Sequence, residues 1–261
     1  MEMNYEEILE VSRKISVTAG KAIMEIYNKE EIWQVQYKEN HSPLTLADKK
    51  AHEIIAQELL ARFPECALLS EEGEDDRKRL DNPYCFVVDP LDGTKEFIKK
   101  NGQFTVNIAL AFQGRPVTGV IYAPATGELY YAAKGTGAFL EKDGKTARLH
   151  VSQRTQDPRV VMSSSHGCEQ MERLLKKYHL TNLVRVGSSI KGCMIARGDA
   201  EIYYRHNPTM EWDTAAMQCI VEEAGGIFRQ MDGSEMTYNR EDCVNRKGFF
   251  IINCEQNKLS E

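Results

Sequence analysis

Apolar residues recur at helical spacing in two stretches near the start of the chain. Steps of three and four positions between residues 5 and 27 indicate an amphipathic helix, and they join Ile8, Val11, Ile15, Ala19, Ala22 and Ile26. A second helix is predicted over residues 46–62. Thr45 and Asp48 at its start have the spacing of a capping box, which satisfies the free N–H groups of a first helical turn.

The pattern then changes to short apolar runs that indicate strands. They cover residues 85–88, 104–112, 117–122, 129–133 and 138–141, and Asp143-Gly144 has the composition of a hairpin turn. From residue 151 on, strands alternate with helices, the last of which ends at Gly225-Gly226. We therefore predict an α+β half (residues 1–150) and an α/β half (residues 151–261), with helices layered on sheets.

The charge balance, the apolar runs and the cysteine spacing argue against several kinds of partner, a membrane segment and a cysteine-bound zinc ion. With 39 Asp and Glu against 33 Lys and Arg, the chain lacks the basic character that nucleic acid or an anionic membrane attracts. No apolar run reaches the roughly 18 residues of a membrane span, and the acidic start does not resemble a signal peptide. The seven cysteines include no CxxC pair, so their spacing indicates neither a disulfide framework nor a zinc site. We expect a cytoplasmic protein, with a peripheral position at the inner membrane and the oligomeric state left open.

Two carboxylates stand close together after an apolar strand. The strand is expected to end at Asp89, Pro90 to stop its hydrogen bonding, and Asp92 to lie on a turn that Gly93 folds tightly. Neighbouring carboxylates cannot both stay ionised without a cation, and hard oxygen ligands, including the carbonyl of Leu91, suit Mg²⁺. The alternative is an ordinary turn, for which this composition is also typical.

Two further acids occupy comparable places. Glu71 follows a short apolar run, and Asp213 precedes the long C-terminal helix. If the fold unites them with Asp89 and Asp92, they form a cluster for two or three metal ions, as in phosphoryl-transfer sites. Otherwise Glu71 belongs to a solvated acidic loop and Asp213 caps its helix.

Gly93 and Thr94 open a short segment, residues 95–99, that is plausible as a helix. Free N–H groups and a hydroxyl at such a start suit a phosphate group. A simple N-cap role for Thr94 is the alternative, and both roles are compatible.

Together these motifs resemble those of the inositol monophosphatase superfamily of Mg²⁺-dependent, lithium-sensitive phosphatases, and within it most nearly the bacterial 3'(2'),5'-bisphosphate nucleotidases. The matching segments are residues 42–48, 69–72, 89–94, 93–102, 104–109, 211–216 and 223–226, so the resemblance spans nearly the whole chain. It implies an αβαβα layered sandwich of the sugar phosphatase type, with the active site between the halves.

The resemblance also implies a role for each candidate residue. Two or three Mg²⁺ ions would be held by Glu71, Asp89, the carbonyl of Leu91, Asp92 and Asp213. Gly93 and Thr94 would hold the scissile phosphate, with Leu91, Asp92 and Asp213 also next to the substrate. Asp48, paired with the Thr94 hydroxyl, would act with Glu71 to deprotonate the attacking water.

Residues of the second half, 151–261, would determine the substrate specificity. Ser188 and Lys191 lie three apart, on one face if they are helical, and Arg205 follows a strand. Together they could converge on a second phosphate, or they could be solvated surface residues. In the bisphosphate nucleotidases the matching residues hold the other phosphate of the nucleotide, and the residue matching His166 lies by the adenine, whereas inositol monophosphatases have an acid where Arg205 stands.

The resemblance thus implies hydrolysis of adenosine 3',5'-bisphosphate to AMP and phosphate, and of its sulfated precursor as a second substrate, in support of sulfur assimilation. An inositol or sugar monophosphatase of the same superfamily is the alternative enzyme. A nucleotide or cation sensor is the alternative without catalysis, although the intact set of acids argues against it. The chain has no GxxxxGK, GxSxG or HExxH motif, so P-loop kinase, serine hydrolase and zincin chemistry lack support.

Overall fold

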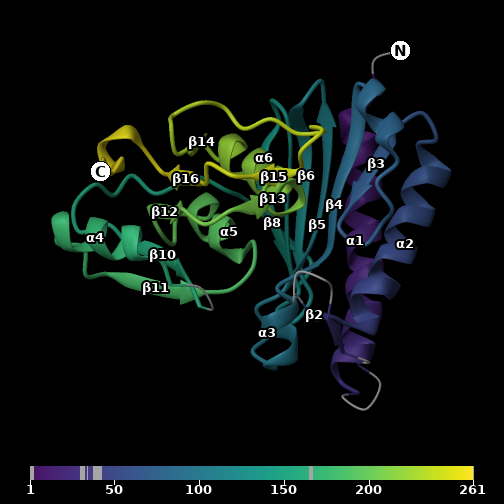
Figure 1. The fold of residues 1–261 in the computed structure, drawn as a ribbon, viewed down its shortest axis with the longest axis horizontal. Helices are drawn as coiled ribbons and strands as arrows, with labels where there is room; N and C mark the ends of the chain where they lie inside the picture. Colours follow the sequence, from purple (N-terminus) through teal and green to yellow (C-terminus); the bar gives the residue numbers. More distant parts are fainter. Residues whose placement is uncertain (1–2, 30–32, 34, 38–42, 165–166, 261) are drawn as a thin grey trace.

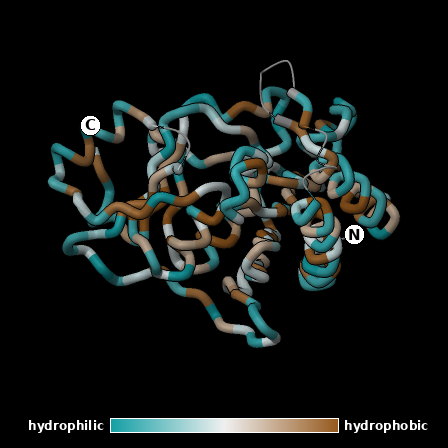
Figure 2. The backbone as a smooth tube through the Cα atoms, turned by 90° about the horizontal axis from the view of Figure 1, so that it is seen from below, coloured by the Kyte–Doolittle hydropathy of each residue, from teal (hydrophilic) through white to brown (hydrophobic). Residues whose placement is uncertain are grey.

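The computed structural model describes residues 3–29, 33, 35–37, 43–164 and 167–260. Helices and sheets alternate in layers, so that the chain forms the predicted αβαβα sandwich (Figure 1). Hydrophobic segments concentrate in the interior of the layers, whereas the outer loops are largely hydrophilic (Figure 2).

The first sheet has seven strands in the order β3-β4-β5-β6-β7-β8-β9. Strand β3 runs parallel to β4, and the following pairs are antiparallel. Asp143 and Gly144 connect β8 and β9 with φ values of 51° and 70°, which confirms the hairpin turn. The strands are β3 (Ala67–Ser70), β4 (Tyr84–Asp92), β5 (Thr105–Phe112), β6 (Arg115–Ala123), β7 (Glu128–Ala133), β8 (Gly137–Lys142) and β9 (Lys145–Arg148).

Helices cover both faces of this sheet, and the strand pleat explains why its central strands are apolar throughout. Ile108 of β5 packs into the core beneath α1 (Tyr5–Tyr27) and α2 (Leu46–Arg62), whereas its neighbour Ala109 packs against α5 (Ile190–Ala196) and α6 (Ala215–Glu223) on the other side. Both N-terminal helices have the predicted bounds, and the predicted capping box at Thr45 and Asp48 is formed.

The second sheet has five strands in the order β11-β10-β12-β16-β14. Its inner face packs on α5 and α6, and its outer face packs on α4 (Glu169–Lys177). Gly225, with φ +89°, follows the end of α6 as predicted. The strands are β10 (Val160–Ser163), β11 (Leu183–Val186), β12 (Ile202–Arg205), β14 (Ile227–Gln230) and β16 (Phe249–Ile252).

The remaining elements are short. Two pairs of strands form small ribbons, the helix α3 follows β4, and 3₁₀ turns connect larger elements. Within the described residues, no helix combines the length and the apolar character that crossing a membrane requires. These elements are β1 (Gln36–Tyr37), β2 (Pro43–Leu44), β13 (Thr209–Met210), β15 (Val244–Asn245), α3 (Thr94–Ile98), η2 (Arg77–Asp81), η3 (Glu211–Asp213) and η4 (Glu255–Asn257).

Candidate active site between the two sheets

Strand β4 continues past Asp89 to Asp92, which corrects the prediction that Pro90 ends the strand and that Asp92 lies on a turn. Asp89 pairs with Asn107 of β5 and Asp92 with Thr105, so three steps on β4 oppose two on β5. This register shift is a β-bulge, and because a bulge leaves one residue outside the ladder, it tolerates a proline without an N–H. The bulge also lets the N–H of Leu91 donate to Asp89 Oδ1 at 3.0 Å.

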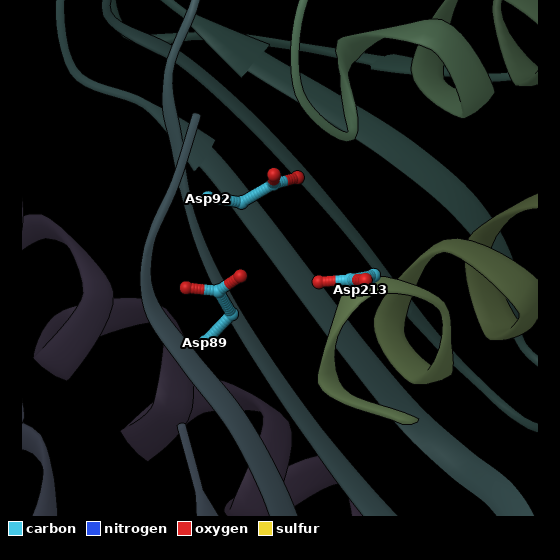
Figure 3. A group of neighbouring side chains, drawn as sticks. All are labelled: Asp89, Asp92 and Asp213. Carbon is cyan, nitrogen blue, oxygen red and sulfur yellow. The ribbon is translucent and has the colours of Figure 1, made fainter. Parts of the chain in front are cut away.

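Asp213 joins the two aspartates of β4 from the segment before α6, which lies on the face of the sheet that borders the cavity. It lies in η3, directly before α6, and its Oδ2 accepts the N–H of Met210 at 2.7 Å. Asp89, Asp92 and Asp213 each present an oxygen within 4.8 Å of the others, and Figure 3 shows the three carboxylates facing a common point. Asp213 therefore makes a local hydrogen bond and also completes a cluster with acids more than 120 positions away.

The cluster is electrostatically strained in the absence of a cation. Burial raises the pKa of Asp89 well above its usual value, and the negative charges of Glu71, Asp92 and Asp213 raise it further. Burial also raises the pKa of Asp213 to about 8, with Asp92 as the largest charge acting on it. Converging hard oxygen donors that oppose one another's ionisation fit a hard divalent cation such as Mg²⁺.

Glu71 lies beside the cluster rather than within its tightest group. Its backbone N–H donates to the carbonyl of Val88 at 3.1 Å, which anchors the turn after β3 to β4. Its side chain lines the same cavity as the three aspartates and acts electrostatically on Asp89 and Asp213. The structure thus brings all four predicted acids to one cavity.

Asp48 and Thr94 meet at the edge of the cluster, as predicted. The Thr94 hydroxyl donates to Asp48 Oδ1 at 3.0 Å, and Thr45 donates to Asp48 Oδ2 from both its N–H and its hydroxyl, at 2.8 and 2.6 Å. Asp48 is only 2% exposed, and this burial raises its pKa although the Thr45 hydrogen bonds lower it. Gly93, in the left-handed conformation, is the N-cap of α3, so Thr94 is its first residue. The carbonyl of Leu91 lies 3.4 Å from the Thr94 hydroxyl.

Two cationic side chains line the other side of this cavity. Lys191 is 7% exposed, and its Nζ donates to the carbonyl of Ser188 at 2.5 Å. Arg205 ends β12, and its buried Nε has no hydrogen-bond partner among the described residues. Burial lowers the pKa of Lys191 to about 8, and the nearby Arg205 acts in the same direction. An anion between Lys191 and Arg205 would satisfy both groups.

The helix expected to carry both Ser188 and Lys191 on one face begins only at Ile190. Ser188 lies before the helix with φ +48°, so it does not share a helical face with Lys191, and the two meet through the hydrogen bond to the Ser188 carbonyl instead. Both still line the cavity. His166, predicted beside the adenine, lies outside the described residues.

The cavity has a volume of about 260 Å³, large enough for a small organic ligand. It separates the acidic cluster of the first sheet from the cations next to the second sheet. Its lining includes Glu71, Asp89, Leu91, Asp92, Gly93, Thr94, Ser188, Lys191, Arg205 and Asp213.

Sequence reasoning missed three polar residues that tie the two sides of the cavity together. Asn107 donates to Ser189 Oγ at 2.9 Å, and Ser189 in turn donates to Asp92 Oδ2 at 2.6 Å. Gln103 Oε1 accepts the N–H of Gly187 at 2.8 Å. Asn107 could have been suspected as a polar residue inside an apolar strand, but no local pattern singles out Ser189 or Gln103.

Fold and site together define a class of protein. The family model for the inositol monophosphatase family matches residues 4–256, and the chain therefore belongs to that family.

Comparison with individual members of the family shows which of them this chain resembles in sequence and structure. The chain is 39% identical to the 3'(2'),5'-bisphosphate nucleotidase CysQ of Salmonella typhimurium, across 94% of this chain and 99% of that protein. The Escherichia coli K12 protein of the same name is 38% identical, across 91% and 96%. The crystal structure of CysQ from Bacteroides thetaiotaomicron, a bacterial member of the inositol monophosphatase family, superposes with a TM-score of 0.85 at 38% identity, over 97% of this chain and all of that one. The extragenic suppressor protein suhB of Bartonella henselae gives 0.81 at 30% identity, over 95% and 94%.

Proposed function

We propose that this chain is a Mg²⁺-dependent 3'(2'),5'-bisphosphate nucleotidase that hydrolyses adenosine 3',5'-bisphosphate to AMP and phosphate. The observation that carries this proposal is the pairing, in one cavity, of a carboxylate cluster with Lys191 and Arg205. A bisphosphate presents one phosphate for hydrolysis and a second anion for recognition. The relatives named for this activity support the same substrate, and through it a role in sulfur assimilation.

The acidic side of the cavity would perform the hydrolysis. Asp89, Asp92 and Asp213, with Glu71 and the carbonyl of Leu91, would hold two or three Mg²⁺ ions. Bound there, Mg²⁺ would make water nucleophilic near neutral pH and neutralise charge on the phosphate and the leaving oxygen. The chain itself would hold the scissile phosphate next to Gly93 and Thr94, which line the cavity beside the cluster.

Asp48, Thr94 and Glu71 would take the proton of the attacking water. Because the Thr94 hydroxyl donates to Asp48, its oxygen can accept a proton from water while its own proton moves to Asp48 Oδ1. Burial raises the pKa of Asp48, which makes its carboxylate a stronger base than an exposed aspartate. The Thr45 hydrogen bonds fix Oδ2 and leave Oδ1 directed at Thr94.

Lys191, Arg205 and Ser188 would bind the second phosphate. Arg205 can offer two parallel N–H donors to phosphate oxygens, and Lys191 adds a point charge. A neutral polyol such as inositol would bring no negative charge to these two cations, in a place where burial already disfavours the charged form of Lys191. We further propose His166 as a residue next to the adenine.

The cytoplasmic location stays a prediction from the cysteine spacing.

The proposal is tested by measuring phosphate release, in the presence of Mg²⁺, from adenosine 3',5'-bisphosphate and from inositol 1-phosphate. We expect the nucleotide to have the higher kcat/KM by at least tenfold. Preference for the inositol ester would overturn the substrate assignment and favour an inositol monophosphatase. Nucleotide binding without any turnover, measured in the same preparation, would favour a sensor.

A further inference from the structure

Ser189 lies at the junction of the two sides of the cavity. Its side chain is fully buried, and it is the N-cap residue of α5, between Ser188 and Lys191. Its hydroxyl contacts groups from three other elements of the chain, β4, β5 and η3. The distances from Ser189 Oγ are 2.6 Å to Asp92 Oδ2, 2.9 Å to Asn107 Nδ2 and 3.3 Å to the carbonyl oxygen of Asp213.

The geometry fixes the direction of these hydrogen bonds. Asn107 Nδ2 can only donate, so Ser189 Oγ accepts from it. The single Ser189 proton then goes to Asp92 Oδ2, because this oxygen, at 2.6 Å, is nearer than the Asp213 carbonyl oxygen at 3.3 Å. Asn107 Nδ2 also lies 3.4 Å from the same Asp92 oxygen.

As a consequence, the two carboxylate oxygens of Asp92 differ in their hydrogen bonding. Oδ2 is held by Ser189 and Asn107, whereas Oδ1 has no hydrogen-bond partner among the described residues. A carboxylate held at one oxygen cannot rotate freely about its terminal torsion, so the other oxygen keeps one orientation. Ligand carboxylates that are hydrogen-bonded in this way bind metals more tightly than carboxylates that are free to rotate.

We propose that Ser189 is a positioning residue: it holds Asp92 in the orientation that binds Mg²⁺ and joins this carboxylate to the loop that reads the second phosphate. The inference rests on the proposed function, since it takes Asp92 as a ligand of Mg²⁺. It goes beyond that function because it gives Ser189, which contacts no reacting atom, control over metal affinity. The loop is held independently by the hydrogen bond from Gly187 to Gln103, so loss of the Ser189 hydroxyl should act on the metal more than on the nucleotide.

The test is calorimetric titration of Mg²⁺, without nucleotide, into chelator-treated full-length protein. For Ser189→Ala we expect the Kd for Mg²⁺ to rise about tenfold or more. At saturating Mg²⁺ the KM for the bisphosphate should change less than about threefold, while the Mg²⁺ concentration for half-maximal kcat rises in parallel with Kd. Ser189→Thr, which keeps the hydroxyl, should restore much of the affinity, and Ser189→Cys, which fills the same space with a weak donor, should not.

Ser12→Ala is the matched control. Ser12 is 1% exposed, and its hydroxyl has no partner among the described residues, so this variant removes a buried hydroxyl without breaking a hydrogen bond. Its Kd for Mg²⁺ should equal that of the wild type. A Ser189→Ala Kd within twofold of the wild type would overturn the inference, and so would an equal rise in both variants.

The melting temperature of each variant in EDTA reports folding, and Ser189→Cys supplies the comparison if Ser189→Ala does not fold. Failure of the proposed substrate appears only in the nucleotide assay and leaves the Mg²⁺ titration unaffected. Absence of Mg²⁺ binding in the wild type would instead refute the metal site and this inference with it.

Discussion

Lys191 permits a test of the proposed substrate through pH alone. Burial and, to a smaller extent, the neighbouring Arg205 lower the pKa of this lysine to about 8, against the opposing charges of Asp92, Glu96 and Asp213. The ammonium form is therefore present near neutrality and is lost as the pH rises through 8. Recognition of a second phosphate should weaken over the same interval.

The size of the effect follows from the fraction of protonated lysine. With a pKa of about 8, roughly 90% of Lys191 is charged at pH 7 and about 9% at pH 9. A ligand that requires the ammonium should lose about tenfold in kcat/KM between these two values, because kcat/KM reports the ionisation of the free enzyme. The phosphate itself does not add to this change, since its second pKa lies near 6.

The assay compares adenosine 3',5'-bisphosphate with adenosine 3'-monophosphate at saturating Mg²⁺. Titration of the catalytic carboxylates affects both substrates and cancels in the ratio of their kcat/KM values. We expect this ratio to fall about tenfold from pH 7 to pH 9 in the wild type. In Lys191→Arg it should stay flat, because a guanidinium keeps its charge throughout this range. A flat or rising ratio in the wild type would refute the placement of the second phosphate at Lys191.

Three further perturbations have defined outcomes. Arg205→Glu should lower kcat/KM for the bisphosphate about 10- to 100-fold, the value of a hydrogen bond to a charged group, and leave the 3'-monophosphate within a few-fold; equal losses would contradict its role. In EDTA the melting temperature should fall from pH 6 to pH 8, because the folded pKa of Asp213, about 8, exceeds its unfolded value, so that unfolding releases a proton in this interval; Asp213→Asn should reduce this slope and abolish stabilisation by Mg²⁺. Gly119→Ala would place a Cβ 2.6 Å from the carbonyl oxygen of Ala216 and should lower the free energy of unfolding, measured by urea denaturation, by about 1–3 kcal/mol, whereas Gly167→Ala, in open space, should not change it.

Local patterns were sufficient for the two N-terminal helices. The bounds of α1 and α2 agree with the sequence prediction because apolar periodicity and capping residues act within a few positions, as at Asn4 and Thr45. Most strands of both sheets were also located, because they are short apolar runs bounded by turn residues, whereas β3 was not predicted and the polar, exposed β9 has no apolar run.

The departures from prediction have physical causes that no short window contains. Pro90 lacks an N–H and locally favours the end of a strand, but the partner strand accommodates it in a bulge. Ser188 adopts a positive φ, which a serine takes only where surrounding structure holds it there. The hydrogen bond from Ser189 to Asp92 spans 97 positions, and that from Gly187 to Gln103 spans 84, so neither leaves a periodic trace in the sequence.

Helix α6 covers the inner face of the first sheet, and this has a consequence for the order of events during synthesis. Ala109 and Ile121 bury their side chains against residues of a helix that the ribosome makes about a hundred positions later. Until α6 has emerged from the ribosome, the nascent sheet exposes an apolar surface. Asp89 and Asp92 lack Asp213, the third carboxylate of the cluster, during the same interval. The growing chain therefore passes through a long interval in which a chaperone can protect that surface, and the acidic cluster is assembled only after Asp213 has been made.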